Sequence, residues 1–348
     1  MSVYIIAEAG VNHNGDLKLA KELVDMAKQC GADAIKFQTF KAEESTGIKA
    51  DKAAYQKIND SIEESQYEMI KRLELPFSDI ARKYRKKEGN FSDFAILKEY
   101  CKYREIDFIS TPDGEESLKC LIDINISKLK VGSTEVTNYP FLEKIAKTGK
   151  PVILSTGMST LGEVEKAVDI LLENGVTDLE LMHCTTDYPA EYEEVNLKSM
   201  VTLRNAFYLP VGYSDHTSGI EAGIAATAMG AVVLEKHITL DKEMQGPDHK
   251  ASMDCSEFKS YVTHIRNTEK LLGNGKKKPT LKEKSIMLQV RRSILASRDL
   301  KEGTVLTEDM LCLKRPGTGI EPVFLPILIG RKIKRDLKED DILTWEDV

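Results

Sequence analysis

The chain has 348 residues, of which 41% are hydrophobic and 30% are charged, and a formal net charge of −7. This length exceeds what one barrel-sized domain needs, so we expect a large domain followed by a small one. The acidic balance argues against nucleic-acid binding. No apolar run approaches the ~20 residues of a membrane span, and no basic segment precedes the first apolar run, so we expect a cytoplasmic protein without membrane contact.

Apolar runs recur along residues 1–272 and alternate with helical patterns, as in parallel βα units. The runs predict eight strands, at 3–8, 34–38, 108–111, 128–131, 152–155, 179–183, 211–214 and 232–236. Between them the spacing predicts helices at 17–29, 92–102, 116–122, 139–147, 161–174, 197–206 and 221–229. Eight such units favour a closed (β/α)8 TIM barrel, since no G-x-G-x-x-G turn follows the first strand as a doubly wound dinucleotide-binding sheet requires.

Two stretches do not follow the alternation of strands and helices. The connection from Phe40 to Asn90 is long and polar and leaves the carboxyl end of a strand, so we expect it to lie over the barrel mouth. Residues 273–287 are predicted to be a linker, and residues 288–348 a turn-rich module. A module of this size is marginal alone, so it is expected to dock on a partner surface.

Polar residues stand at the predicted carboxyl end of every strand, where a barrel of this kind keeps its chemistry. His216 and His237 are candidate ligands of a divalent metal. Lys36 and Lys130, with nearby hydroxyl groups, suit a phosphate or carboxylate anion. Either lysine could instead be the Schiff-base nucleophile of a class I aldolase, which needs no metal.

The chain resembles the sialic acid synthase family, on the N-acetylneuraminate and legionaminate branch. The matching stretches are IAEAGVNHNG at 6–15, IKFQT at 35–39, GKPVILSTGM at 149–158, GYSDHT at 212–217, EKH at 235–237 and GPDHKAS at 246–252. The tail, with KRPG at 314–317, is similar to the family's SAF domain, an antifreeze-like β-clip fold. Residues 63–66 and 246–252 are dissimilar to pseudaminic acid synthases.

The resemblance implies roles for individual residues. His216 and His237 match metal ligands that usually hold Mn²⁺, with Mg²⁺ or Co²⁺ as alternatives. Other positions match contacts to phosphoenolpyruvate: Lys36, Thr111, Lys130, Ser133, Ser155, Ser214 and, where the family typically carries asparagine, Thr186. A third set matches positions around the reacting sugar: Glu8, Gln38, Tyr188 and Asp248. Arg315 matches an arginine that reaches the neighbouring subunit's site in a domain-swapped homodimer.

Three departures from the family's pattern lie at Thr186, Thr134 and Asp113, and residues 77–90 look like an insertion. The implied reaction condenses phosphoenolpyruvate with an open-chain N-acetylated sugar to a nine-carbon 2-keto acid and phosphate. In it the catalytic residues are Glu8, Asp248, His216 and His237. The sequence leaves two alternatives: a condensation on the same fold that makes a seven- or eight-carbon keto acid, and a non-catalytic sugar-binding protein.

Overall fold

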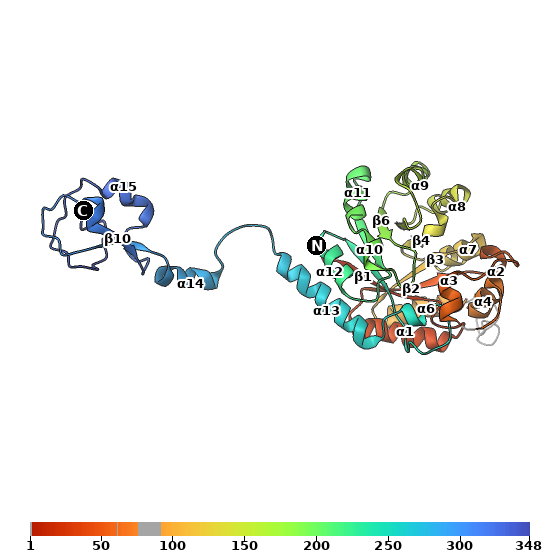
Figure 1. The fold of residues 1–348 in the computed structure, drawn as a ribbon. Helices are drawn as coiled ribbons and strands as arrows, with labels where there is room; N and C mark the ends of the chain where they lie inside the picture. Colours follow the sequence, from red (N-terminus) through yellow and green to blue (C-terminus); the bar gives the residue numbers. More distant parts are fainter. Residues whose placement is uncertain (1, 61, 76–91) are drawn as a thin grey trace. The chain divides into compact units, whose positions relative to one another are not determined.

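Eight parallel strands pair in sequence order and close on themselves, because β1 pairs with both β2 and β8 (Figure 1). The computed structural model describes residues 2–60, 62–75 and 92–348. The strands are β1 Tyr4–Gly10, β2 Ala34–Thr39, β3 Asp107–Pro112, β4 Leu129–Val131, β5 Val152–Ser155, β6 Leu179–Cys184, β7 Val211–Asp215 and β8 Val233–His237. The predicted TIM barrel is therefore confirmed, and every strand lies within two residues of its predicted bounds.

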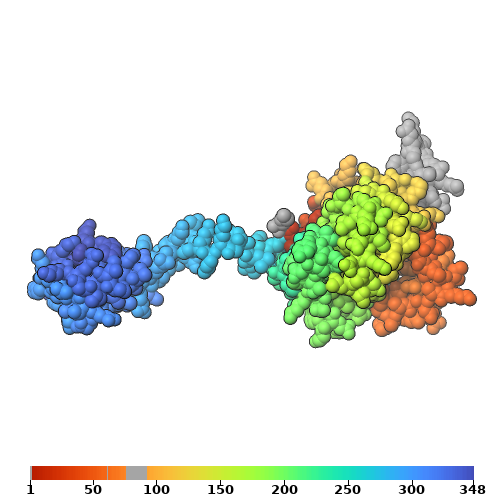
Figure 2. Space-filling model, turned by 90° about the horizontal axis from the view of Figure 1, so that it is seen from above, coloured from red at the N-terminus to blue at the C-terminus, as the bar shows by residue number. Residues whose placement is uncertain are grey.

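Helices surround the strands (Figure 1), and in Figure 2 the atoms of the second half of the barrel, yellow to green, form a continuous outer surface. The major helices are α1 Leu17–Cys30, α6 Asp93–Tyr103, α7 Glu115–Asp123, α8 Tyr139–Ala146, α9 Leu161–Glu173, α11 Lys198–Phe207, α12 Glu221–Ala228 and α13 Cys255–Leu272. The start of α9 follows directly from the sequence, since Thr160 accepts from the Glu163 amide and Glu163 bonds back to Thr160.

Short elements lie in the connections at the barrel mouth. They are α2 Ala42–Ser45, α3 Ala54–Asn59, α4 Gln66–Leu73, η1 Ser133–Glu135, α10 Tyr192–Val195 and η2 His249–Ala251. The first three, α2, α3 and α4, lie in the long connection after β2. The predicted insertion at 77–90 lies outside the described residues.

The barrel interior is apolar along part of its axis and polar at the carboxyl ends of the strands. The apolar part is filled by side chains at most 1% exposed, namely Ile6, Ala34, Ile109, Ile153, Met182 and Val233. A second, larger apolar core fills the space between strands and helices. Since both cores are apolar, polar side chains that point inward gather at the carboxyl ends of the strands.

The chain divides into two compact units, Met1–Gly273 and Asn274–Val348. In the second, β9 Ser293–Ala296 pairs antiparallel with β10 Leu311–Lys314, and isolated bridges join residues 295, 300 and 305 to residues 342, 337 and 332. Its remaining elements are α14 Leu281–Val290, η3 Glu308–Met310, η4 Pro322–Phe324 and α15 Leu325–Leu328. The unit has its own apolar core, which includes Ile294, Leu306 and Leu343.

Helix α14 begins inside the segment 273–287 that the sequence indicates as a linker. Its N-terminus is capped by Thr280, whose side chain accepts from the Glu283 amide. Within the described ranges, no helix combines the length and the apolar character needed to span a membrane.

His13, in the β1–α1 connection, gives the barrel a defined acid sensitivity. The side chain is fully buried, its Nδ1 accepts from the Gly15 amide at 3.0 Å, and burial lowers its pKa to about 3. The unfolded chain therefore binds a proton below about pH 6.5 that the folded chain does not bind. Because the pKa is lowered on folding, stability is complete above pH 6.5 and is lost as the pH falls toward 3.

We expect His13→Asn to flatten the dependence of the unfolding free energy on pH. Asparagine keeps an acceptor for the Gly15 amide and does not titrate. At about pH 5, protonation of His13 in the unfolded chain should have lowered the unfolding free energy of the wild type by about 2 kcal/mol. Urea denaturation at a series of pH values measures this loss. The exposed His264→Asn is the matched control. If the unfolding free energy of wild type and of His13→Asn changes with pH at the same rate between pH 6.5 and about 4.5, His13 is not the source of the acid sensitivity.

Candidate active site

A pocket of about 220 Å³ opens at the carboxyl ends of the strands. It brings together twelve of the predicted site residues: Glu8, Lys36, Gln38, Thr111, Lys130, Ser133, Ser155, Thr186, Tyr188, Ser214, His216 and His237. Asp248 lines an adjoining cavity, and Arg315 belongs to the second unit. Parallel pairing explains the convergence, since strands in register end at one edge of the barrel.

Two lysines and two carboxylates form a buried charge network across the pocket floor. Lys36 Nζ lies 2.8 Å from Glu8 Oε1 and 3.7 Å from Glu235 Oε2, and Lys130 Nζ lies 3.4 Å from Glu235 Oε1. The register places Glu8 opposite Lys36 on one side and His237 on the other. All four charged side chains are at most 5% exposed, so each charge depends on its partners.

The two carboxyl groups differ in acidity. Burial raises the pKa of Glu8 to about 7 against the opposing effect of Lys36. Burial also acts on Glu235, but Lys130 and Lys36 outweigh it and lower its pKa. Since two carboxyls with separated pKa values divide acid and base roles, Glu8 is the group that can gain and lose a proton near neutral pH, while Glu235 stays ionised.

The lysines are oriented by hydroxyl groups. Lys130 Nζ donates to Ser155 Oγ at 2.7 Å, and Lys36 Nζ donates to Thr111 Oγ1 at 3.2 Å. Burial lowers the pKa of Lys130, whereas Glu235 and Glu8 outweigh burial and raise that of Lys36. Two fixed ammonium groups flanked by hydroxyls make a site for an anion with two charged ends.

The wall beside this anion site depends on a glycine. A Cβ on Gly157 would lie 2.3 Å from Thr186 Oγ1 and 2.9 Å from Ser133 Oγ. The glycine thus lets its amide approach and donate to Ser133 Oγ at 2.9 Å. Thr186, where the family typically carries asparagine, lies on this wall.

His216 and His237 lie side by side, with ring centroids 5.6 Å apart. Tyr188 packs against both rings, at 4.2 Å and 5.6 Å between centroids. Burial lowers the pKa of His216 to about 4 and holds that of His237 well below its usual value, so both imidazoles are neutral at physiological pH.

These histidines fit a divalent metal by their donor chemistry. His216 Nδ1 lies 2.6 Å from the Thr185 carbonyl oxygen, so Nδ1 carries the proton and Nε2 keeps its lone pair. His237 Nδ1 is buried with no hydrogen-bond partner among the described residues. The described ranges contain no cluster of three or more His, Cys, Asp or Glu side chains arranged to hold a metal. Two imidazoles would therefore leave several coordination positions for oxygen ligands.

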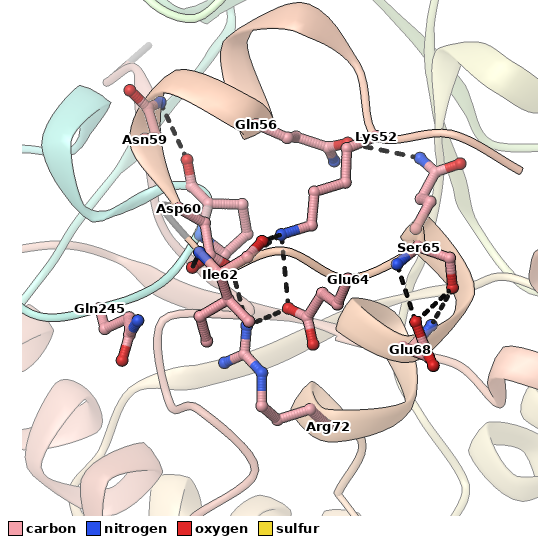
Figure 3. Close-up of polar contacts among 12 residues, drawn as sticks. Lys52, Gln56, Asn59, Asp60, Ile62, Glu64, Ser65, Glu68, Arg72 and Gln245 are labelled. Atoms are coloured by element: carbon pink, nitrogen blue, oxygen red, sulfur yellow. Dashed lines mark hydrogen bonds and ion pairs between the residues drawn. The ribbon is translucent and has the colours of Figure 1, made fainter.

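A cap formed by part of the long β2–α6 connection borders this end of the pocket. The cap, residues 41–75 without residue 61, carries α2, α3 and α4. An ion network, which we term the clamp, holds its turns together: Lys52, Asp60, Glu64 and Arg72 (Figure 3). Arg72 Nη2 lies 2.7 Å from both Asp60 Oδ2 and Glu64 Oε1, and Lys52 Nζ donates to the Ile62 carbonyl at 2.8 Å.

The cap is also bonded to the segment that carries Asp248. Asn59 Nδ2 donates to the Pro247 carbonyl at 3.0 Å (Figure 3), and Lys250 Nζ donates to the Ile58 carbonyl at 3.4 Å. Burial raises the pKa of Asp248 to about 6. The predicted position of the long connection over the barrel mouth agrees with these contacts.

We expect Asp60→Asn to destabilise the cap, because it removes the buried anion shared by Lys52 and Arg72. Breaking a buried pair by removing one partner costs about 3–5 kcal/mol. Amides in α3 and α4 should then exchange faster in hydrogen exchange, with the barrel strands unaffected. The control, Glu43→Gln, removes an exposed partner of Lys71, and because exposed ion pairs contribute little, it should leave the exchange rates in α3 and α4 unchanged. Unchanged exchange in α3 and α4 contradicts the clamp's role.

Sequence reasoning assigned no role to three residues that the structure places at the site. Glu235 bridges both lysines, and Tyr55 and Gln56 line the cavity beside Asp248. Glu235 belongs to the ring of polar residues that the sequence predicts at the strand ends, although no specific role was assigned to it. The other two lie in a connection without a strong periodic pattern.

Two departures from the family's pattern lie on the pocket wall. Asp113 and Thr134 line the pocket and a neighbouring hollow of about 580 Å³ that Glu135 also lines. Burial, together with the Glu135 charge, raises the pKa of Asp113 to about 7. The hollow is lined by residues of the cap and of the connections that follow β3 and β4.

The fold and the site define a TIM-barrel protein whose pocket presents two buried lysines beside two neutral imidazoles. The NeuB family matches residues 23–277, and the SAF domain matches residues 291–348. The chain belongs to the NeuB family, with a C-terminal SAF domain.

Relatives match over nearly the whole chain. It is 47% identical to the N,N'-diacetyllegionaminic acid synthase of Legionella pneumophila, over 100% of this chain and 95% of that protein. It is 46% identical to the synthase of the same name from Campylobacter jejuni, over 97% and 98%. The crystal structure of N-acetylneuraminic acid synthetase from Leptospira borgpetersenii is 34% identical, with a TM-score of 0.68 over 82% of this chain and 90% of that one.

Proposed function

We propose that this enzyme condenses phosphoenolpyruvate with an open-chain N-acetylated sugar, giving a nine-carbon 2-keto sugar acid and phosphate. The sugar is 2,4-diacetamido-2,4,6-trideoxymannose, which gives diacetyllegionaminate, or N-acetylmannosamine, which gives N-acetylneuraminate. The observation that carries the proposal is the pair of buried lysines in the pocket of a chain 47% identical to a legionaminic acid synthase. That identity favours the diacetamido sugar.

Lys36 and Lys130 bind the phosphate and carboxylate groups of phosphoenolpyruvate, and their hydroxyl partners fix its orientation. Carbon 3 of phosphoenolpyruvate then attacks the sugar aldehyde, forming the new carbon–carbon bond, and the aldehyde oxygen takes the proton that Glu8 acquires when phosphoenolpyruvate binds. Positive charge develops at carbon 2, next to the ionised Glu235. The ionised Glu8 then orients the water that adds to carbon 2 and accepts its proton. The bond from carbon 2 to the bridging oxygen breaks, the carbon 2 hydroxyl gives its proton to the departing phosphate, and the ketone forms.

His216 and His237 would hold a divalent metal, with manganese as our proposal, which supplies a Lewis acid for the aldehyde oxygen. Asp248 accepts hydrogen bonds from the sugar. Phosphoenolpyruvate labelled at the bridging oxygen tests the bond that breaks. The label should appear in phosphate, and its appearance in the ketose contradicts cleavage between carbon 2 and oxygen.

Phosphate release with Mn²⁺ tests the reaction, with four sugars offered in parallel: the diacetamido sugar, N-acetylmannosamine, its 6-phosphate and arabinose 5-phosphate. We expect release with the diacetamido sugar to be fastest and to stop on chelation. Release with the pentose phosphate alone would assign the enzyme to the eight-carbon branch. No release with any sugar would favour a non-catalytic binding protein.

We further propose a domain-swapped homodimer in which Arg315 enters the partner's site. A heterodimer of Arg315→Ala and Glu8→Gln subunits tests it. In a swapped dimer, one barrel has an intact Glu8 together with the other subunit's Arg315, so activity returns. Without a swap both sites stay defective, and the heterodimer should be as inactive as the two variants alone.

A further inference from the structure

Two cysteines on neighbouring helices of the barrel bring their sulfur atoms into contact. Cys30 is the last residue of α1, Cys255 is the first residue of α13, and their Sγ atoms lie 3.3 Å apart. The Cys30 thiol also donates to the Cys255 carbonyl oxygen at 3.4 Å, so its side chain is directed at the start of α13. Other cysteines bond oxygen atoms instead, as Cys120 does with Ser92.

The backbone on both sides of this contact is held by helix capping. Gly31 ends α1 in the left-handed region with φ 88°, and its amide donates to the Lys28 carbonyl at 3.1 Å. Asp254 caps the start of α13, where it accepts from the Ser256 and Glu257 amides at 2.8 and 2.9 Å. The two sulfur atoms therefore extend from fixed helix ends.

This arrangement suits a covalent bond between the two sulfur atoms. A disulfide places them about 2.05 Å apart, so each pair of side chains starting at this separation has to close a gap of about 1 Å. Small side-chain rotations supply such a shift while the helix ends stay in place. The two positions are 225 residues apart in the chain, so the bond would join distant segments.

The bond would cross the line at which the barrel closes. There β1 pairs with β8, and α1 follows β1 as α13 follows β8. Helices α1 and α13 are in contact (Figure 1), so a link between them ties the first βα unit to the last. The connections after β1 and β8 are already hydrogen-bonded, since Asn14 Nδ2 donates to the Gln245 carbonyl at 3.0 Å. A disulfide adds a covalent tie to this noncovalent contact.

We propose that Cys30 and Cys255 form a reversible disulfide that links α1 to α13 when the surroundings become oxidising. The oxidant is a low-molecular-weight disulfide. Cys255 is the more exposed of the pair, so its thiolate attacks one sulfur of the oxidant and releases one small thiol. The Cys30 thiolate then attacks Cys255 Sγ and displaces the second small thiol. The protein thiols lose two electrons and two protons, which the two small thiols carry away.

The burial of Cys30 assigns it the second step. Burial raises the pKa of the Cys30 thiol to about 12, so this group seldom ionises and its attack sets the rate. In a reducing compartment both side chains stay thiols, and the bond forms when the ratio of disulfide to thiol rises. Once formed, it stabilises the barrel because it constrains the unfolded chain across a long loop.

Peptide mapping by mass spectrometry tests the bond directly. The folded full-length chain would be treated with oxidised glutathione at about pH 8, alkylated without reduction and digested. We expect a peptide pair joined through Cys30 and Cys255, which dithiothreitol separates. Cys30→Ala should instead retain glutathione on Cys255. A wild type that carries glutathione on Cys255 without the joined pair, or that reacts at neither cysteine, overturns the proposal.

Thermal melting measures the effect of the bond on stability. Oxidation should raise the Tm of the barrel by about 4–8 °C, and dithiothreitol should reverse the rise. Cys30→Ala and Cys255→Ser should show no shift on oxidation, whatever their stability in the reduced state. The controls Cys120→Ser and Cys312→Ser keep the pair and should shift as the wild type does. A joined pair that leaves the Tm unchanged or lowers it refutes the stabilising role.

Discussion

Glu8→Gln is expected to lower kcat for phosphate release by about 10²- to 10⁴-fold, the usual contribution of a positioned acid–base group. The amide matches the carboxyl in volume, so packing is retained, while the proton acceptor is lost. Lys36 keeps Glu235 as a partner at 3.7 Å, so phosphoenolpyruvate should still bind. Steady-state kinetics together with calorimetry of phosphoenolpyruvate binding separates the two effects.

The control for this substitution is Glu22→Gln, which removes an exposed carboxylate of α1 that pairs only with Lys18 among the ion pairs described. It should leave kcat unchanged. A Glu8→Gln enzyme that keeps at least about one tenth of the wild-type kcat shows that Glu8 only balances the charge of Lys36.

His237→Gln is expected to lower the affinity for Mn²⁺ more than about 100-fold. Loss of a residue that merely supports a metal ligand lowers metal affinity about 10- to 100-fold, so loss of one of the two proposed imidazole ligands should lower it more. Calorimetric titration with Mn²⁺ in the absence of substrates gives the affinity directly. Phosphate release should fall in parallel.

The exposed His264→Gln controls for a general effect of losing a histidine and should bind Mn²⁺ as the wild type does. Unchanged Mn²⁺ affinity in His237→Gln would place the metal elsewhere. A variant that binds no metal yet releases phosphate at the wild-type rate would remove the metal from the reaction.

The barrel could be predicted from the sequence because its signal is local. Apolar runs and helix periodicity located every strand, although β1 extends two residues beyond its predicted end, to Gly10. The two extra residues are Ala9 and Gly10, whose small size gives no apolar pattern, and so they resemble a loop in sequence. They belong to the strand because Gly10 pairs with Phe37 of β2, which no sequence pattern reports.

The polar ring at the strand ends was also predictable, since parallel strands end at the same edge. The contacts that its residues make with one another were not predictable. Glu235 reaches Lys130 across the barrel, and that contact depends on strand register and side-chain direction. The cap illustrates a further limit: α3 has six residues, too few for a periodic signal, and long-range contacts such as Asn59 to Pro247 hold it in place.

The charge network on the pocket floor has a thermodynamic consequence for the resting enzyme. With Glu8 ionised, two ammonium groups face two carboxylates, so the floor is electroneutral before substrate arrives. An incoming phosphate and carboxylate bring an excess of negative charge, which favours proton uptake by the least acidic carboxyl group. Substrate binding and protonation are therefore linked equilibria, and the apparent affinity for phosphoenolpyruvate should weaken as the solution becomes more alkaline.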